Sequence, residues 1–151
     1  MMKVIANNKK VSHDYFIMDT YECGIVLFGT EIKSIRLGKV AINDSFCRIK
    51  QGELFAINMN VSKYAFGNLF NHDETRERKL LMAKHEILKL DLKLKQEGTT
   101  LIPTKVYLKD GFCKVEIALC KGKKLYDKRA DQKETDTLRR MEKVIKNFSS
   151  D

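Results

Sequence analysis

Two polar-glycine turns divide much of the chain into paired apolar runs, and they limit the possible folds more than any other feature. Gln51-Gly52 lies in the middle of residues 44–60, and Asp110-Gly111 separates residues 101–108 from residues 112–120. A polar residue followed by glycine between two apolar runs is the usual signal of a tight hairpin turn. The sequence therefore predicts two antiparallel hairpins.

The second hairpin has a clear two-residue period in its second arm. Side chains on a strand point alternately to its two sides, so one set of positions faces the core and the other faces solvent. The apolar set is Cys113, Val115, Ile117 and Leu119, and the opposite set includes Lys114 and Glu116. We expect this arm to be half buried.

The remaining patterned segments predict more strands and a few helices. Residues 13–29 have the pattern of two strands, and Thr30 to Gly38 has that of a short helix with a cap and a stop. Residues 74–97 are rich in helix formers and predict one or two helices. About six antiparallel strands with few helices favour a mainly β fold, an OB-like closed barrel with flanking helices, because closure removes unpaired edges.

The charge of the chain points to polyanions as partners. The chain has 151 residues, of which 29 are Lys or Arg and 20 are Asp or Glu, which gives a net charge of +9. With 43% hydrophobic residues it can bury a core of its own. The basic clusters are Lys9-Lys10, Lys33 with Arg36, Arg76 with Arg78 and Lys79, and residues 121–129. Four such clusters in one small domain favour contact with phosphates.

The last part of the sequence differs in kind from the rest. Residues 127–137 contain Ala130 as their one apolar group, too little to offset the entropy of ordering. We therefore divide the chain into a barrel over residues 1–126 and a flexible basic tail over residues 127–151. The tail has one helical apolar stripe, which predicts an amphipathic helix in contact with a partner: Leu138, Met141, Ile145 and Phe148.

Other classes of protein receive little support. The sequence has no apolar run long enough to span a bilayer and no signal-peptide pattern, so we expect a cytoplasmic protein. We also expect it to be a monomer. Its four cysteines are far apart, which favours core-filling thiols over a disulfide framework or a metal site. We expect no cofactor and no metal.

Catalysis is also a weak hypothesis. His72-Asp73 is the one pairing that suggests a metal-free hydrolase, and residues 122–124 are too short for a phosphate-binding P-loop. A stronger alternative is a general single-stranded nucleic-acid binder that stacks bases on rings such as Tyr15 and Tyr126 in a basic groove. From the residues alone, both the hydrolase and the general nucleic-acid binder stay open as alternatives.

Several motifs, in order along nearly the whole chain, resemble the SmpB family, the tmRNA-binding proteins of bacterial trans-translation. They are residues 8–10 (NKK), 13–17 (HDYFI), 29–36 (GTEIKSIR), 38–39 (GK), 44–45 (DS), 67–68 (GN), 70–73 (FNHD), 78–81 (RKLL), 113–116 (CKVE) and 121–129 (KGKKLYDKR). Departures from the family pattern occur at Ser12, Glu74 and Ala83.

The resemblance implies a role rather than a reaction. Such a protein is an adaptor that binds the transfer-RNA-like domain of tmRNA, the SsrA RNA. With elongation factor Tu and GTP on the aminoacylated tmRNA, it reaches stalled ribosomes, where it contacts the decoding centre and the messenger channel.

The resemblance also implies site residues. Glu22, Leu81 and Lys114 match positions that contact tmRNA. Further tmRNA-binding predictions are Lys10, His13, Lys33, Arg36, Lys79, Lys121, Lys123 and Lys124. The tail residues predicted to contact the ribosome are Tyr126, Asp127, Lys128, Arg129, Ile145 and Lys146.

Overall fold

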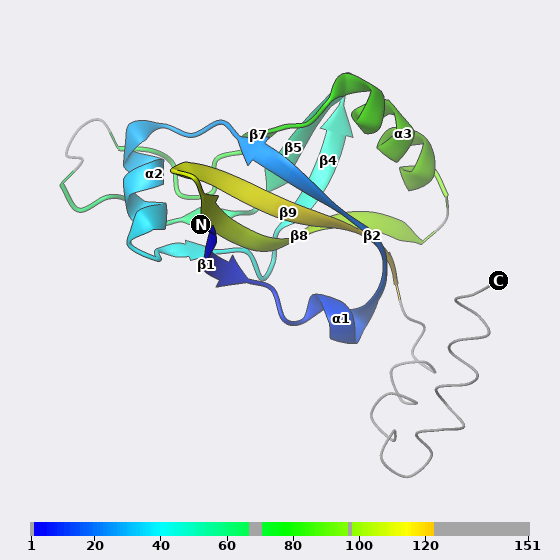
Figure 1. Cartoon of the computed structure of the whole chain (residues 1–151), viewed down its shortest axis with the longest axis horizontal. Coiled ribbons are helices and arrows are strands. Elements are labelled where there is room, and N and C mark those ends of the chain that lie inside the picture. Colours follow the sequence, from blue (N-terminus) through cyan, green and yellow to red (C-terminus); the bar gives the residue numbers. More distant parts are fainter. Residues whose placement is uncertain (1, 67–70, 97, 123–151) are drawn as a thin grey trace, which may run out of the picture.

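The computed structural model describes residues 2–66, 71–96 and 98–122, and these form a mainly β fold with three helices (Figure 1). The helices are α1 (Val11–Asp14), α2 (Gly29–Arg36) and α3 (Lys84–Leu94). The strands are β1 (Met2–Asn7), β2 (Tyr15–Ile25), β3 (Val40–Ala41), β4 (Phe46–Lys50), β5 (Glu53–Ile57), β6 (Asn60–Val61), β7 (Arg78–Leu81), β8 (Thr99–Lys109) and β9 (Phe112–Gly122).

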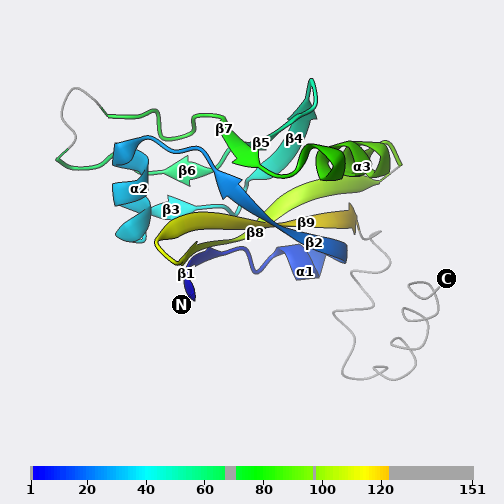
Figure 2. The same ribbon diagram turned by 45° about the horizontal axis from the view of Figure 1, so that its top comes forward.

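Six of the strands form a ring of antiparallel pairs. The order is β8-β4-β5-β7-β2-β9, and β9 pairs again with β8. β1 pairs with the remaining edge of β8, while β3 and β6 form a separate two-stranded sheet. Figure 2 shows β2, β8 and β9 crossing the middle of the molecule, with α2 and α3 at different ends. The mainly β, antiparallel part of the prediction is confirmed.

β8 pairs with three other strands, β1, β4 and β9, and has a bulge in the middle. Leu101, near its start, pairs with Cys47 of β4, whereas residues 105–109 pair with β1. Between these parts the register against β9 shifts by one residue at Thr104, directly after Pro103. Proline removes a ladder hydrogen bond and is tolerated at such bulges. The bulge therefore lies where β8 passes from one neighbour to the other.

Both predicted hairpins are confirmed. Gln51 and Gly52 have φ of 52° and 77°, and Asp110 and Gly111 have φ of 51° and 84°. Positive φ at both central positions is what a two-residue turn needs to match the twist of its strands. Across these turns β4 pairs with β5, and β8 pairs with β9.

The predicted alternation in β9 is also confirmed. Val115, Ile117 and Leu119 are buried and Cys113 packs against the same core, which lies inside the ring. Lys114 and Glu116 point to the outer side and are partly exposed. On that outer side, α1 covers a second, smaller cluster formed by Val11, Ile102, Ala118 and Cys120.

A buried ion pair joins α2 to β7. The side chains of Glu31 and Arg78 are both fully buried, and Arg78 Nε donates to Glu31 Oε2 at 2.5 Å. The other donors of Arg78 reach the carbonyl oxygens of Asp73, Glu74, Arg76 and Met59. All five N–H groups of this guanidinium are thus used. The basic cluster predicted at residues 76–79 is therefore not a free phosphate surface, because Arg78 belongs to the core.

Some predicted elements are wrong. Residues 15–25 form one long strand rather than part of two, since β2 pairs with β9 from Tyr15 to Gly24, with one bulge after Ile17, and with β7 at Gly24 and Ile25. Residues 78–81 are strand β7, and one helix, α3, follows. Arg78 and Leu80 are buried, whereas Leu81 is exposed, which is the alternation of a strand. This burial outweighs the helix propensity of residues 78–81. The cap of α2 is Phe28 rather than Thr30, and β1 was not predicted.

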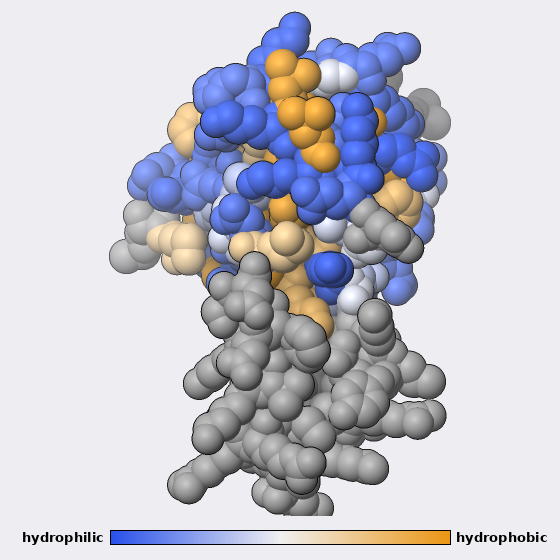
Figure 3. All heavy atoms as spheres, turned by 90° about the vertical axis from the view of Figure 1, so that its right-hand side faces the viewer, coloured by the Kyte–Doolittle hydropathy of each residue, from blue (hydrophilic) through white to orange (hydrophobic). Residues whose placement is uncertain are grey.

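The cysteines and α3 complete the picture of the core. The prediction of core-filling thiols is confirmed for Cys23, Cys47 and Cys120, which are buried free thiols. α3 packs Ile87 and Leu90 inward and exposes other leucines. Figure 3 looks at the side of the molecule where α3 lies and shows a short apolar strip among hydrophilic side chains. Within the described residues no helix is long and apolar enough to cross a membrane.

Candidate functional site

The three residues that the family resemblance predicts to contact tmRNA lie together on the outer side of the ring. Gly24 of β2 pairs with Leu81 of β7 on one side and with Lys114 of β9 on the other. Glu22 is two residues before Gly24 and therefore points to the same side. We call this surface the Glu22 face and define it by Glu22, Leu81, Lys114, Tyr107 and Lys109.

Glu22 is held by two side chains of β8. Tyr107 donates its hydroxyl to Glu22 Oε2 at 2.5 Å, and Lys109 Nζ lies 3.4 Å from the same oxygen. The Glu22 side chain is 43% exposed. Since both contacts go to Oε2, Oε1 remains available to accept a hydrogen bond from a ligand.

The electrostatics of the face favour an ionised Glu22. The hydrogen bond from Tyr107 lowers the pKa of Glu22, and the charges of Lys109 and Lys114 lower it further, although partial desolvation opposes them. Burial and the same hydrogen bond raise the pKa of Tyr107, so this phenol stays protonated and donates. The face thus presents an oriented Glu22 carboxylate near two ammonium groups, and Glu116 pairs with Glu22 across β2 and β9.

Leu81 gives the face an apolar element. Its side chain is 50% exposed, and its Cβ lies 3.3 Å from the position that a Cβ on residue 24 would occupy. The absence of a side chain at Gly24 therefore lets Leu81 lie close against β2, next to Glu22. Lys79, also predicted to bind RNA, is two residues before Leu81 and points to the same outer side, where its Nζ is 3.4 Å from Glu53 Oε1.

Tyr107 and Lys109 were missed by the sequence analysis, although the sequence contained a signal for them. In a hairpin with a two-residue turn, residues at equal distances from the turn are paired. The turn at Asp110-Gly111 therefore pairs Lys109 with Phe112 and Tyr107 with Lys114, as the structure shows. Both missed residues must then share the face of Lys114.

Lys10, His13 and Lys121 lie at the other end of β2. Seven residues separate Tyr15, which follows α1, from Glu22, a strand length of roughly 23 Å. His13 Nδ1 is 2.9 Å from Asp14 Oδ1, and Lys121 pairs with Phe16. These three predicted contacts are thus not part of the Glu22 face.

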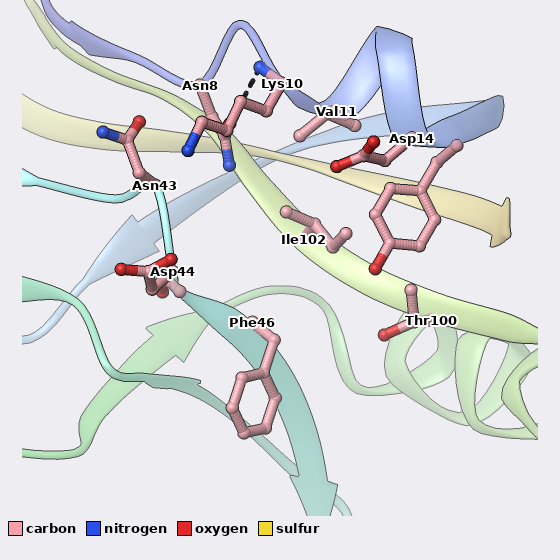
Figure 4. A pocket seen from close by; sticks show the side chains of 11 residues that line it. Asn8, Lys10, Val11, Asp14, Asn43, Asp44, Phe46, Thr100 and Ile102 are labelled. Atoms are coloured by element: carbon pink, nitrogen blue, oxygen red, sulfur yellow. Dashed lines mark hydrogen bonds between the residues drawn. The ribbon is translucent and has the colours of Figure 1, made fainter. Parts of the chain in front are cut away.

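Lys10 lines a groove between the N-terminal segment and the start of β4 (Figure 4). The groove also contains the carboxylates of Asp14 and Asp44 and the ring of Phe46. The backbone N–H of Lys10 donates to Asn8 Oδ1 at 3.2 Å, which fixes the chain at the rim. A groove with one cation and two carboxylates is less suited to a phosphate than an isolated lysine would be.

Lys33 and Arg36 lie on α2, beyond the C-terminal end of β2, and both are exposed. Lys33 Nζ is 5.5 Å from the centre of the Tyr64 ring. The structure therefore divides the predicted RNA contacts among the Glu22 face, the α1 end and α2. The remaining predicted sites lie outside the described residues: Lys123, Lys124, Tyr126, Asp127, Lys128, Arg129, Ile145 and Lys146.

His72 and Asp73 do not form a catalytic pair. His72 is buried, its Nε2 donates to the Val61 carbonyl at 2.8 Å, and its Nδ1 is 2.8 Å from the Thr30 hydroxyl. Asp73 instead accepts from the backbone N–H of Thr75. His72 thus ties the segment before β7 to α2, and neither ring nitrogen is free to act as a base.

Comparison with known proteins gives consistent matches over almost the whole chain. A family model described as SmpB protein matches residues 5–147. The chain is 55% identical over 145 residues to a protein named SsrA-binding protein from Thermoanaerobacter pseudethanolicus, covering 96% of this chain and 93% of the relative. To the protein of the same name from Bacillus velezensis it is 56% identical over 144 residues, covering 95% and 92%.

A solved structure agrees with these relatives. It is described as "tmRNA-SmpB: a journey to the center of the bacterial ribosome", and it matches with a TM-score of 0.67 and 47% identity. The match covers 85% of this chain and 91% of the other.

Proposed function

The chain belongs to the SmpB family, and we propose that it binds tmRNA and brings it to stalled ribosomes for trans-translation, that is, ribosome rescue and tagging of incomplete proteins. The observation that carries this function is the match to SsrA-binding proteins at 51 to 56% identity over nearly the full chain. The related solved structure combines SmpB, tmRNA and the bacterial ribosome.

The Glu22 face is the surface that we propose for the transfer-RNA-like domain of tmRNA. Lys109 and Lys114 supply cations for phosphates, and each phosphate contact releases condensed counterions. Glu22 Oε1 accepts from a base amine or a ribose 2′-hydroxyl, which is the chemistry that a carboxylate can offer to RNA. Leu81 packs against a sugar or base beside them.

The fold supports this role as a rigid platform. We propose that the ring of six strands is an OB-like closed barrel, a fold whose strand faces commonly bind nucleic acids. Contacts on paired strands keep their geometry better than contacts on loops. In this proposal the protein is an adaptor rather than an enzyme, acts as a monomer in the cytoplasm, and meets elongation factor Tu on the aminoacylated tmRNA.

We assign residues 127–151 to the ribosome. Tyr126, Asp127, Lys128 and Arg129 would contact the decoding centre, and Ile145 and Lys146 the messenger channel. A helix over residues 137–148 would form there, because an isolated helix of this length is marginal in water. Deletion of residues 130–151 should then leave tmRNA binding nearly intact and abolish tagging of a truncated message.

The test of the binding function is a competition experiment with labelled tRNA-like domain of tmRNA. An unlabelled copy of this structured RNA should displace the probe at much lower concentration than an unstructured RNA of equal length. Equal displacement by the two RNAs would favour a general single-stranded nucleic-acid binder instead.

A further inference from the structure

Phe28, directly before α2, has a half-exposed ring on a rigid backbone. The side chain is 53% exposed. Its backbone N–H donates to Glu31 Oε1 at 2.7 Å, and its carbonyl accepts from the N–H groups of Glu31 at 3.0 Å and Ile32 at 3.1 Å. The backbone that carries this ring is therefore fixed by the cap of the helix.

A guanidinium covers one side of the Phe28 ring. The Arg76 Cζ lies 4.1 Å from the ring centre, the shortest cation-to-ring distance among the described residues. Arg76 Nη2 donates to Glu31 Oε1 at 2.6 Å and to the Val26 carbonyl at 3.3 Å. Because Glu31 is itself fixed by the buried Arg78, the guanidinium remains over the ring without a ligand.

The Phe28 ring and Arg76 together make a preorganised stacking surface. The ring is planar, apolar and half exposed, and a cation lies over it. Aromatic rings and arginine planes are the groups on which proteins stack unpaired bases. The exposed side chains of α2 are mainly charged and include Lys33 and Arg36, which suits a polyanion better than an apolar protein surface.

We propose that Phe28, backed by Arg76, stacks on one unpaired nucleobase of the bound RNA. The inference rests on the proposed function, since it takes tmRNA as that RNA, and it adds a contact outside the Glu22 face. Phe28 follows Gly24 by four residues, which span at most about 14 Å of chain. One RNA therefore reaches both the Glu22 face and the ring.

The experiment exploits the absence of tryptophan from the chain. The variant Phe28→Trp introduces a single indole at the proposed stacking position, and Leu92→Trp introduces one on exposed α3 as the matched control. The probe is the tRNA-like domain of tmRNA, transcribed in vitro. We expect saturating RNA to quench the indole fluorescence of Phe28→Trp strongly and that of Leu92→Trp little.

Affinity measurements with the same RNA complete the test. Phe28→Ala and Phe28→Leu should each weaken binding about tenfold, because each removes the ring on which the base stacks. Phe28→Trp should bind as well as the wild type, because it keeps a ring over Arg76. A thermal unfolding curve for each variant separates loss of the ring from loss of the fold.

The outcomes distinguish this inference from the proposed function. If the wild type binds the RNA and Lys114→Ala weakens binding, but Phe28→Leu binds normally and Phe28→Trp is not quenched, the stacking surface is wrong and the function stands. If the wild type does not bind the RNA, the proposed function itself fails. Reduced affinity of Phe28→Leu with strong quenching of Phe28→Trp supports the inference.

Discussion

Two glutamates in this fold accept hydrogen bonds from side chains of neighbouring strands or loops but differ in burial. Glu31 on α2 meets Arg76 and Arg78, and Glu22 on β2 meets Tyr107 and Lys109. The Glu31 side chain is fully buried, whereas that of Glu22 is 43% exposed. Their difference shows how the surroundings of a carboxylate decide whether all its oxygens serve the fold or whether it stays accessible to a ligand.

Every acceptor position of Glu31 is directed to the protein itself. Its Oε1 accepts from Arg76 and from the Phe28 N–H, and its Oε2 accepts from Arg78 and Arg76. No oxygen is left for a ligand, and the bonds connect α2 with β7. Burial makes each lost bond expensive, because the abandoned donors cannot turn to water.

Glu22, in contrast, is oriented but not enclosed. Its two contacts leave Oε1 free and keep the carboxylate ionised beside two lysines. Such exposed pairs contribute little to stability. In the proposed function, what they provide is a fixed geometry for a polar group of the RNA.

The largest expected effect is on stability and separates the two glutamates directly. Glu31→Gln keeps the shape but removes the charge that faces two guanidinium groups, so the free energy of unfolding should fall by about 3–5 kcal/mol. Glu22→Gln is the matched control and should lose less than ~1 kcal/mol. Urea unfolding at neutral pH measures both values. Similar losses in the two variants would mean that burial does not distinguish these carboxylates.

Acid titration should show the same contrast. Burial alone would raise the pKa of Glu31, but the hydrogen bonds from Arg76 and the Phe28 N–H and the charge of Arg78 lower it below its ordinary value of 4.5. A carboxylate with a lowered pKa in the folded state stabilises fully above its unfolded pKa and loses this contribution as pH falls through the folded value.

The measurement is urea unfolding at a series of pH values from 7 down to 3. The wild type should lose stability below about pH 4.5, and Glu31→Gln should lose less over the same range, because it has no proton to bind there. Parallel curves for the wild type and Glu31→Gln would show that other carboxylates cause the acid sensitivity.

A smaller effect, on binding, is expected at Glu22. Glu22→Gln removes the charge that holds Lys109 and weakens any hydrogen bond from RNA, so affinity for the tRNA-like domain should fall about tenfold. Glu77→Gln is the control, because Glu77 is also an exposed carboxylate paired with a lysine, Lys50, but lies outside the Glu22 face. A titration that finds equal affinity for Glu22→Gln and the wild type would remove Glu22 from the RNA surface.

The sequence predicted those parts of the fold that depend on local chemistry. The turns at Gln51-Gly52 and Asp110-Gly111 and the alternation along β9 follow from backbone preference and side-chain period, and all are confirmed. The helical prediction for residues 74–97 is confirmed at α3 but wrong at residues 78–81, because pairing with β5 and burial of Arg78 make that segment a strand, and neither is visible locally.

The candidate site was predictable only in part. Glu22, Leu81 and Lys114 came from family resemblance, and nothing in their own neighbourhoods joins them, since their strands meet only through long-range pairing. Counting outward from the turn would have added Tyr107 and Lys109. The pairing of Arg76 with Phe28 brings together residues 48 positions apart, and no periodicity encodes such a contact.

The smallest expected effect is that of a substitution at Gly24, where Leu81 lies close to the backbone of β2. Gly24 has an ordinary backbone conformation, so alanine is not strained there. The new Cβ would lie 3.3 Å from Leu81 Cβ and 3.4 Å from its Cδ1, which requires Leu81 to shift by a few tenths of an ångström. Because Leu81 is half exposed, it has room to move outward, and stability should change by less than ~1 kcal/mol.

The displacement of Leu81 in Gly24→Ala should also weaken RNA binding. Leu81 would rise from β2 beside Glu22, so an RNA seated on the face should lose contact with one of the two side chains. We expect Gly24→Ala to bind the tRNA-like domain a few-fold more weakly, and Gly24→Ala with Leu81→Ala to bind no worse than Leu81→Ala alone, because the clash is then absent. Additive losses in the double variant would show that Gly24 acts through a direct approach of RNA to the backbone and not through Leu81.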